Sequence, residues 1–334
     1  MTGKATARAH PIQGLVKYHG LRETEGRHPY HDSISVCTAP SNTTTTVAWE
    51  PDASEDTYLI DGEPAEGRGA ERIDNVVDAI REHAGFDHAV RVESANSFPS
   101  NVGFGSSASG FAALAYAACE AAGLDLTRPE VSAFARRGSS SAARAVTGAY
   151  SDLHTGLNDH DSRSERIEAG TGELDGEPFD LEEDLRIVTA LVPSYKETEA
   201  AHREAADSHM FDARRAHVQD QLAEARDALR DGEFHRTFEI AEHDSLSLAA
   251  TTMTGPAGWV YWQPETIAVF NAVRELRTDE DVPVYFSTDT GASVYVNTTA
   301  DHADRVADRI GEVGVETDVW EVGGPARTVD DALF

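Results

Sequence analysis

The sequence predicts a mixed α+β fold in which strands and helices do not alternate regularly. The first observation is length, because 334 residues suit one large domain or two lobes that share a cleft. The second is composition: hydrophobic residues make up 40% of the chain, which supports a real core and excludes wholesale disorder. The third is the order of the predicted elements, which lacks a βαβα pattern and so disfavours a doubly wound sheet.

The N-terminal part of the chain is predicted to hold three strands and one helix. The strands are expected over 12–18, 33–49 and 88–94, and the helix over 71–83. The stretch 33–49 is rich in Thr and Val, and residues 88–94 alternate between apolar and polar. The helix is defined by apolar residues spaced i, i+3, i+4, i+7, namely Ile73, Val76, Val77 and Ile80.

A turn-rich loop and three helices are expected next. The loop covers 94–105 and leads directly into a strongly apolar helix. Gly123 ends that helix as a C-terminal cap, and Pro129 suits the first turn of the following one. The three helices are expected over 106–122, 129–137 and 139–146.

The second half of the chain is predicted to be richer in helix. The acidic, Gly-rich stretch 158–183 is interpreted as a hairpin and insertion near a lobe boundary. Strands are expected over 186–193, 282–289, 292–298 and 314–321, of which the middle two form a tight pair. Helices are expected over 207–231, 234–252, 263–276 and 301–312.

The charge of the chain excludes several classes of function. With 59 acidic and 28 basic residues, the formal net charge is −31. A surface this acidic repels nucleic-acid phosphates and anionic lipids, so no nucleic-acid or membrane partner is expected. No apolar run reaches the roughly 18 residues of a membrane span, and the N-terminus lacks the apolar core of a signal peptide. Cys37 and Cys119 are interpreted as buried thiols, and the protein is expected to be cytoplasmic.

Lysine is nearly absent. Of the 28 basic residues only Lys4, Lys17 and Lys196 are lysines. An acidic excess with few lysines resembles the proteins of salt-loving archaea, in whose molar salt a Debye length of about 3 Å screens self-repulsion. Lys4 is expected in a frayed terminus. Lys17 and Lys196 lie in ordered-looking segments, so they are either residual surface lysines or functional ones.

The segment 99–110, PSNVGFGSSASG, is the most informative stretch. Gly103 and Gly105 allow a tight curl with inward N–H groups, and a helix with a positive N-terminal dipole begins directly after them. Small side chains let an anion approach, so the segment predicts a phosphate cradle without a P-loop lysine. It matches neither the Walker A nor the Rossmann pattern. The alternative is an ordinary loop capped by Ser106.

Residues 96–115, NSFPSNVGFGSSASGFAALA, resemble the ATP loop of the GHMP kinase superfamily, and more narrowly its version in mevalonate diphosphate decarboxylases. Four further matches keep the family order: LVKYHG at 15–20, DSIS at 32–35, ARRGSSSAAR at 135–144 and STDTGA at 287–292. The last favours the decarboxylase branch, because small-molecule kinases of this superfamily usually carry a glycine-rich loop there.

The resemblance implies a GHMP-kinase-like two-lobe α+β fold with the active site in the cleft between the lobes. An N-terminal lobe, 1–187, would carry the ATP loop, and a C-terminal lobe, 188–334, would supply a catalytic aspartate. Family members are commonly homodimers, so a homodimer is expected. The reaction implied is ATP-dependent phosphorylation of a tertiary alcohol, followed by loss of phosphate and CO2 to give an alkene.

The resemblance assigns three catalytic residues. Asp289 matches the family aspartate, which would orient the tertiary hydroxyl and accept its proton; the alternative is a turn-capping aspartate. Arg144 matches the arginine that binds the substrate carboxylate, for which a planar guanidinium is suited; the alternative is a surface arginine. Lys17 would contact phosphate or the reacting hydroxyl. Substrate-binding roles are expected for Tyr18, Ser139 and Ser141, besides Arg144.

ATP and Mg²⁺ are the expected cofactors. The residues expected to bind ATP are Gly103, Gly105, Ser106, Ser107, Ala108 and Lys196, with Ser107 also near the metal. The match of Lys196 is loose. Bringing several negative charges into an acidic protein requires a local positive field, for which Lys17, Arg144, the loop amides and Mg²⁺ are the candidates.

Departures from the family pattern bear on the substrate. The second lysine of the family's early motif is replaced by Leu21, His31-Asp32 stands where an asparagine is usual, and 197–202 replaces a Ser- and Thr-containing segment. Fewer polar groups at the phosphate end favour mevalonate 5-phosphate, with isopentenyl phosphate as the product in an archaeal mevalonate route. The alternative substrate is mevalonate 5-diphosphate. A GHMP-type kinase that does not decarboxylate, or a non-catalytic binding protein, are alternatives from other classes.

Overall fold

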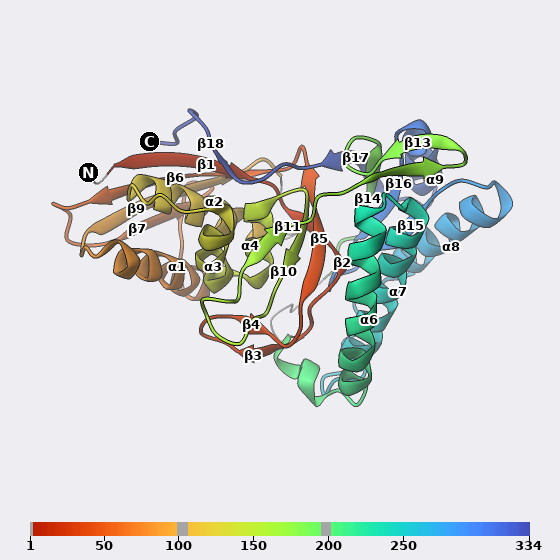
Figure 1. Ribbon diagram of the computed structural model, residues 1–334, viewed down its shortest axis with the longest axis horizontal. Helices are drawn as coiled ribbons and strands as arrows, with labels where there is room; N and C mark the ends of the chain where they lie inside the picture. The colour runs from red at the N-terminus through yellow and green to blue at the C-terminus, as the bar shows by residue number, and fades with distance from the viewer. Residues whose placement is uncertain (1–2, 99–105, 195–201) are drawn as a thin grey trace.

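The computed structural model describes residues 3–98, 106–194 and 202–334. Figure 1 shows an elongated molecule with a sheet and short helices at one end and a group of longer helices at the other. Both ends of the chain lie at the first of these ends. None of the helices within the described ranges combines the length and the hydropathy that a membrane span requires.

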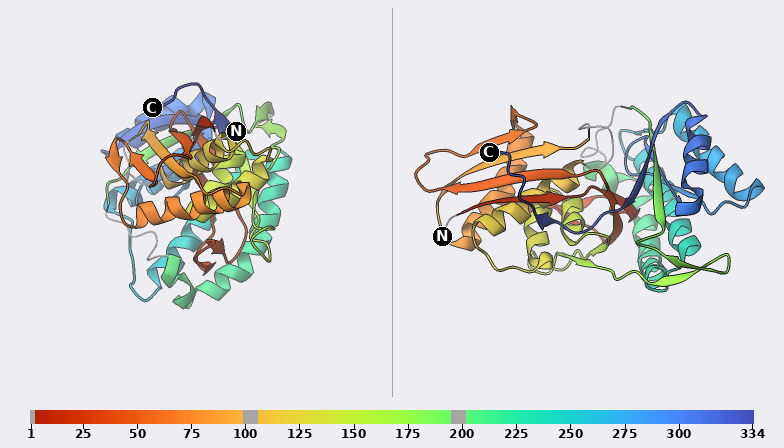
Figure 2. Two further views of the ribbon diagram at one scale, coloured as in Figure 1. Left: turned by 90° about the vertical axis from the view of Figure 1, so that its left-hand side faces the viewer. Right: turned by 90° about the horizontal axis from the view of Figure 1, so that it is seen from above.

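The first sheet has six strands, and helices cover one of its faces. Seen from above, its long strands lie side by side with helices beneath them (Figure 2). Those helices are α1 (Arg68–Ala84) and α2 (Ser106–Ala121), whose apolar faces meet strand residues such as Val47 and Val92 in one core. The strand order is β18 (Arg327–Thr328), β1 (Lys4–Ala9), β6 (Thr43–Glu50), β9 (Ala89–Asn96), β7 (Thr57–Ile60) and β8 (Glu63–Pro64).

The second sheet has eight strands and runs through both halves of the molecule. Its central pairing joins β5 to β17 antiparallel, with Ala39 opposite Glu321, and β2 (Ile12–Val16) pairs with β5 off the main path. The main order is β11 (Ser164–Arg166), β10 (Tyr150–Leu153), β5 (Ser33–Ala39), β17 (Glu316–Val322), β14 (Leu185–Leu191), β16 (Val294–Thr299) and β15 (Tyr285–Ser287).

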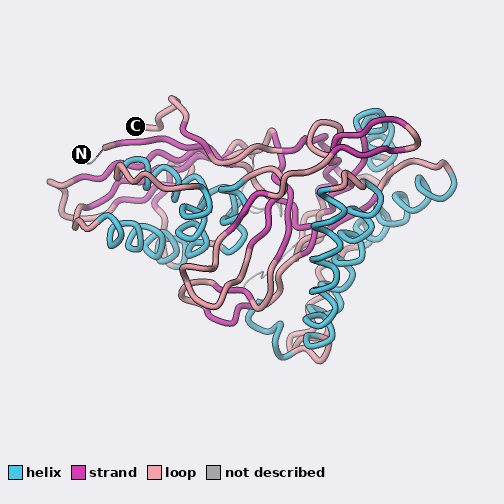
Figure 3. Tube along the Cα trace, in the orientation of Figure 1, coloured by secondary structure: helices cyan, strands magenta, loops and turns pink. Residues whose placement is uncertain are grey.

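Helices pack on both faces of the second sheet beyond β17, and Figure 3 shows the long helices gathered at that end of the molecule. On one side α6 and α7 share a core with β2, β14 and Tyr295, and on the other α8 and α9 share a core with β14, β15 and β16. The bounds are α6 (Phe211–Arg230), α7 (Phe234–Met253), α8 (Pro264–Asp279) and α9 (Ala303–Gly311). The first half adds α3 (Arg128–Gly138) and α4 (Ser140–Thr147). Shorter pieces are the hairpins β3 (Leu21–Glu23)–β4 (His28–Pro29) and β12 (Thr171–Leu174)–β13 (Glu177–Asp180), and the 3₁₀ turns Ala205–Asp207 and Ala300–His302.

Most predicted elements are confirmed, including every predicted helix, the hairpin in 158–183 and two buried free cysteines. Two predictions are wrong. The stretch 33–49 is two strands, because Pro40 lacks an N–H donor and the Asn42 side chain instead closes a turn onto the Pro40 carbonyl. Lys4 does not lie in a frayed terminus, since it begins β1 and pairs with Ala48. The lobe boundary at 187 stays a prediction, and it falls within β14.

Candidate active site

The predicted catalytic residues converge where the second sheet meets α4, α6 and α7. Lys17 and Tyr18 follow directly after β2, Arg144 lies on α4, and Asp289 lies in the turn after β15. These segments are far apart in the sequence and are joined by the pairing of β2 with β5 and by the packing of α7 on β2 and β15. The sheet therefore positions the three charged side chains relative to one another.

Asp289 is placed by a contact with a glycine. Its Oδ1 accepts a hydrogen bond from the Gly14 N–H at 3.3 Å. A Cβ atom at position 14 would lie 2.6 Å from Lys17 Cγ and 3.0 Å from Asp289 Oδ1, so only glycine leaves both side chains in place. Burial, together with the charge and hydrogen bond of Asp289, raises the pKa of the Tyr295 hydroxyl well above its usual value, so Tyr295 is neutral beside the carboxylate.

Lys17 is buried at 5% exposure, and its ammonium lies among polar groups. Nζ donates to Ser245 Oγ at 3.1 Å and lies 3.6 Å from Asp244 Oδ2. Burial lowers the pKa of Lys17, and the repulsion of Arg214 adds to this, whereas the carboxylates of Asp244 and Asp289 raise it. The neighbouring charges therefore influence the protonation of Lys17, and one of them is the candidate base Asp289.

Arg144 is buried on α4. Its Nη1 donates to Ser33 Oγ, and its guanidinium carbon lies 5.6 Å from the centre of the Tyr18 ring. Burial lowers the pKa of Arg144, and the neighbouring Tyr18 and Asp289 oppose that shift. Its buried Nε has no hydrogen-bond partner within the described ranges, so one donor of the fork is left for a ligand.

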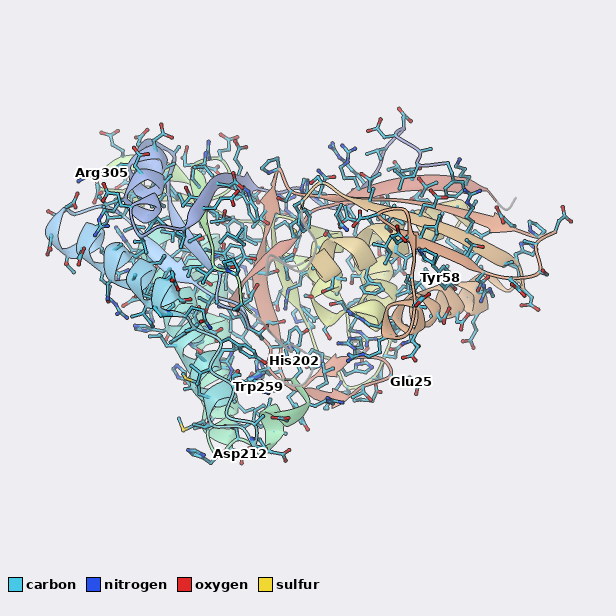
Figure 4. The ribbon with its side chains drawn as sticks, turned by 180° about the vertical axis from the view of Figure 1, so that it is seen from behind. Glu25, Tyr58, His202, Asp212, Trp259 and Arg305 are labelled. Atoms are coloured by element: carbon cyan, nitrogen blue, oxygen red, sulfur yellow. The ribbon has the colours of Figure 1, made fainter. Side chains whose placement is uncertain are left out.

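Of the other predicted substrate residues, Ser139 and Ser141 lie at the start of α4, the helix that carries Arg144, and Tyr18 follows Lys17. Ser139 and Ser141 share a hydrogen bond of 2.9 Å at the start of α4, and Ser139 is buried. The Tyr18 ring stacks on His202 with centroids 4.9 Å apart and an interplanar angle of 14°. His202 Nδ1 accepts from the Gly20 N–H at 3.4 Å. Figure 4 shows His202 between the two ends of the molecule.

The predicted ATP-binding residues are described only in part. Gly103, Gly105 and Lys196 lie outside the described residues, so their roles stay predictions. Ser106 begins α2, Ser107 follows it and is exposed, and Ala108 is buried. The first turn of α2 contains no acidic residue, so no carboxylate of that turn opposes an anion at the positive end of the helix dipole. The start of α2 can therefore accept an anion, together with a divalent cation bound to that anion.

A pocket opens beside Asp289 and Thr290 at the C-terminal end of α7. Trp259 and Tyr261 stack in its wall, with ring centroids 5.8 Å apart. Its other lining residues are Leu248, Ala249, Thr252, Met253, Val260 and Trp262. The largely apolar wall lowers the local dielectric beside Asp289, which strengthens electrostatic interactions there.

Sequence reasoning missed several residues that contact the predicted ones. They are Gly14, Asp244, Ser245, Arg214, His202 and Tyr295. The signal for Asp244 and Ser245 was a polar pair within a helix whose neighbours Ala241 and Leu248 are apolar, and it could have indicated a buried site. His202 carried no signal, because its partner Tyr18 is distant in the sequence.

The comparisons with known proteins agree on one family of decarboxylases. Residues 9–164 match the family described as diphosphomevalonate decarboxylase-like N-terminal domain. The chain is 72% identical over 333 residues to phosphomevalonate decarboxylase of Haloferax volcanii, covering 99% of this chain and 100% of the relative. Mevalonate diphosphate decarboxylase from Staphylococcus aureus is similar in structure, with a TM-score of 0.91, 26% identity and 99% coverage of both chains. A complex of MDDEF with MVAPP, AMPPCP and magnesium has a TM-score of 0.87, 27% identity and 98% coverage of both chains.

Proposed function

Because this chain belongs to the diphosphomevalonate decarboxylase family, with its GHMP-kinase-like fold, we propose that it converts mevalonate 5-phosphate to isopentenyl phosphate in an archaeal mevalonate route to isoprenoids. ATP is consumed, and CO2, ADP and phosphate are released. The observation that carries the proposal is the 72% identity to a phosphomevalonate decarboxylase over the full length of both chains. The site geometry supports it, because a carboxylate, an ammonium and a guanidinium meet in one place.

Asp289 is the proposed base. A tertiary hydroxyl is a weak nucleophile, and a carboxylate within hydrogen-bond reach orients it and accepts its proton. The hydrogen bond from the Gly14 N–H holds Oδ1 of this carboxylate in place in the turn after β15. Lys17 lies on the same side of Gly14, where its positive charge would stabilise negative charge on the transferring phosphoryl group.

Arg144 is the proposed carboxylate-binding residue. Its open Nε donor, with the guanidinium held by Ser33 and Tyr18, would fix the substrate carboxylate for departure as CO2. Ser139 and Ser141 would add hydroxyl donors to the substrate. ATP supplies the phosphoryl group, and Mg²⁺ neutralises charge on its phosphates. We assign the start of α2, with Ser107, to holding them, consistent with the AMPPCP and magnesium in the similar complex.

The preference for the monophosphate rests on the phosphate end of the site. Leu21 offers no charge there, and the neighbouring Arg22 is committed to the carbonyl oxygens of Thr155 and Gly156 at 2.9 and 2.6 Å. His202 covers one face of Tyr18, the residue proposed to contact the substrate. One charge-assisted contact is worth about 1.5–3 kcal/mol, which corresponds to roughly 10- to 100-fold in preference. The second candidate, mevalonate 5-diphosphate, is favoured by the name of the S. aureus structure.

To test this proposal, purified protein is incubated with ATP and Mg²⁺ in molar KCl and with either mevalonate 5-phosphate or mevalonate 5-diphosphate. The CO2 released from each compound is then measured. The proposal expects CO2 from the monophosphate with at least about tenfold higher kcat/KM than from the diphosphate. The reverse preference would support the second candidate. ATP consumption without CO2 from either compound would identify a kinase and overturn the decarboxylase proposal. Light scattering on the same sample tests the expected homodimer.

A further inference from the structure

Three charged side chains, Lys17, Asp244 and Arg214, form a buried cluster between β2, α6 and α7. Their side chains are 6%, 0% and 1% exposed. Burying charges this completely costs several kcal/mol per ion unless they are paired, so a fold tolerates such a cluster only where the pairing is good. Nothing in the substrate chemistry described above uses Asp244 or Arg214, and neither was predicted from the sequence.

Asp244 holds Lys17 by its backbone and by its side chain. Oδ2 of Asp244 accepts from the Lys17 N–H at 2.9 Å and lies 3.6 Å from the Lys17 ammonium. Oδ1 of the same carboxylate accepts from Arg214 Nη2 at 2.9 Å. That Nη2 also donates to the Lys17 carbonyl oxygen at 2.7 Å, so the N–H and the C=O of Lys17 are both fixed by the Asp244–Arg214 pair.

Ser245, the next residue of α7, also contacts the Lys17 ammonium. Ser245 Oγ accepts from Lys17 Nζ at 3.1 Å and from the Thr288 N–H at 3.1 Å. Thr288 directly precedes Asp289, so one hydroxyl joins the lysine to the turn that carries the candidate base. Two adjacent residues of one helix therefore set both the position of the ammonium and its spacing from that turn.

The charge of Lys17 also depends on this cluster. Burial lowers the pKa of Lys17, while Asp244 and, less strongly, Asp289 raise it and Arg214 lowers it. His31 faces the same cluster, but burial and Arg214 lower its pKa to about 4, so it is neutral at working pH. Among the groups around Lys17, Asp244 thus does most to oppose the lowering of its pKa by burial.

We propose that Asp244, clamped by Arg214, is a positioning residue that holds the Lys17 ammonium charged and in register with Asp289 for the phosphoryl-transfer step. This inference rests on the proposed role of Lys17. The alternative is a purely structural ion pair that ties α6 to α7.

The same helix supplies a matched control. Glu242 is buried, pairs through both carboxylate oxygens with Arg277 at 3.0 Å each, and accepts from the Phe286 N–H at 3.2 Å. It resembles Asp244 in burial, in its arginine partner and in its contact with a strand. Unlike Asp244, its carboxylate is directed to Arg277 and Phe286 and not to Lys17. Asp244→Asn and Glu242→Gln therefore remove the same charge from the same helix.

The first measurement is the pH dependence of turnover. Asp244→Asn keeps an oxygen for the Lys17 N–H but removes the charge, so kcat should fall roughly 10- to 100-fold while KM changes little. The alkaline limb of the pH profile should move to lower pH, because a less stabilised ammonium loses its proton sooner. Glu242→Gln should leave the limb in place. An unmoved limb in Asp244→Asn, or the same shift in Glu242→Gln, would overturn the proposal.

The second measurement reads Lys17 directly and needs no activity. The chain has three lysines, Lys4, Lys17 and Lys196, so ¹³Cε-lysine labelling gives three resonances, and Lys17→Arg identifies the one of interest. Its titration midpoint should be lower in Asp244→Asn than in the wild type and unchanged in Glu242→Gln. If Asp244→Asn does not fold, Asp244→Glu keeps the charge and should hold the midpoint within about half a pH unit of the wild type; a drop as large as one unit would contradict the inference.

The two proposals fail in different ways. If the wild-type protein releases no CO2 from either phosphorylated mevalonate, the proposed function is wrong. The lysine titration would still show whether Asp244 raises the titration midpoint of Lys17. A lowered midpoint with unchanged turnover would show that this hold does not serve the reaction, and would overturn the present inference alone.

Discussion

Replacing Asp289 by asparagine removes the candidate base with little change in shape. Asn has an oxygen that can accept the hydrogen bond that Asp289 Oδ1 receives from Gly14 N–H at 3.3 Å, so the turn after β15 should keep its conformation. What is lost is the negative charge and the ability to take a proton. Positioned general bases contribute about 10²–10⁴ in rate, so kcat should fall by that factor.

The same substitution has a second, electrostatic consequence. Asp289 raises the pKa values of both Lys17 and Arg144, so its removal leaves two buried cations with less compensation. The Lys17 pKa should fall further in Asp289→Asn, which adds to the loss of rate at alkaline pH. KM for the phosphorylated substrate should change by less than about threefold, because the lost interactions act in the transition state.

The assay is CO2 release under single-turnover conditions, alongside ADP formation. A matched control is Asp281→Asn, an exposed residue shortly before β15 whose φ of +52° suits asparagine as well as aspartate. The control should retain wild-type turnover. If Asp289→Asn keeps turnover within about tenfold of the wild type, the assignment of the base is wrong. If ADP formation persists while CO2 release stops, the carboxylate acts after phosphorylation.

Three further predictions concern neighbouring groups. Arg144→Lys loses the planar fork and the contact with Tyr18, so KM for the substrate should rise roughly 10- to 100-fold, and a KM within twofold of the wild type would contradict carboxylate binding. Gly14→Ala inserts a methyl group 2.6 Å from Lys17 Cγ and 3.0 Å from Asp289 Oδ1, so kcat should fall about 100-fold and Tm should fall as well, because overpacking a buried site costs about 1–3 kcal/mol; retained activity would show that neither side chain needs its observed position. Although burial would raise the pKa of Asp32, hydrogen bonds from His154 and the Thr155 N–H lower it to about 2, so its stabilising effect is complete at neutral pH and is lost as the pH falls from about 4 toward 2. Denaturant unfolding of Asp32→Asn should therefore show a deficit at pH 7 that narrows below pH 4, and a deficit independent of pH would exclude this ionic origin.

The sequence predicted the helices better than the strands. Apolar spacing such as that of Ile73, Val76, Val77 and Ile80 survives in the buried face of α1, because helix periodicity is a local property. β7 and β8 were missed, since they are short, partly exposed and held by pairing with a distant strand. β1 was missed for the same reason, as its partners β6 and β18 lie far along the chain.

The site divides along similar lines. Asp289, Lys17 and Arg144 were predicted because each stands in a short stretch that resembles a family motif. Asp244 and Arg214 were not, because whether a charged helix residue faces solvent or a buried lysine depends on how two helices pack on a strand. Five further buried residues could be placed near the centre only once β2, β5 and α7 were seen together: Gly14, Ser33, Asp244, Ser245 and Ser287.

The pairing of β5 with β17 has a mechanical consequence. The backbone hydrogen bonds between these strands join the two ends of the molecule, and the chain then returns so that β18 completes the sheet begun by β1. A cut near residue 187 would separate the first part from its edge strand β18 and from β17, one of the three strands that pair with β5. Backbone pairing therefore contributes to the spacing between the groups from β2, α4 and the turn after β15, which come from different parts of the chain.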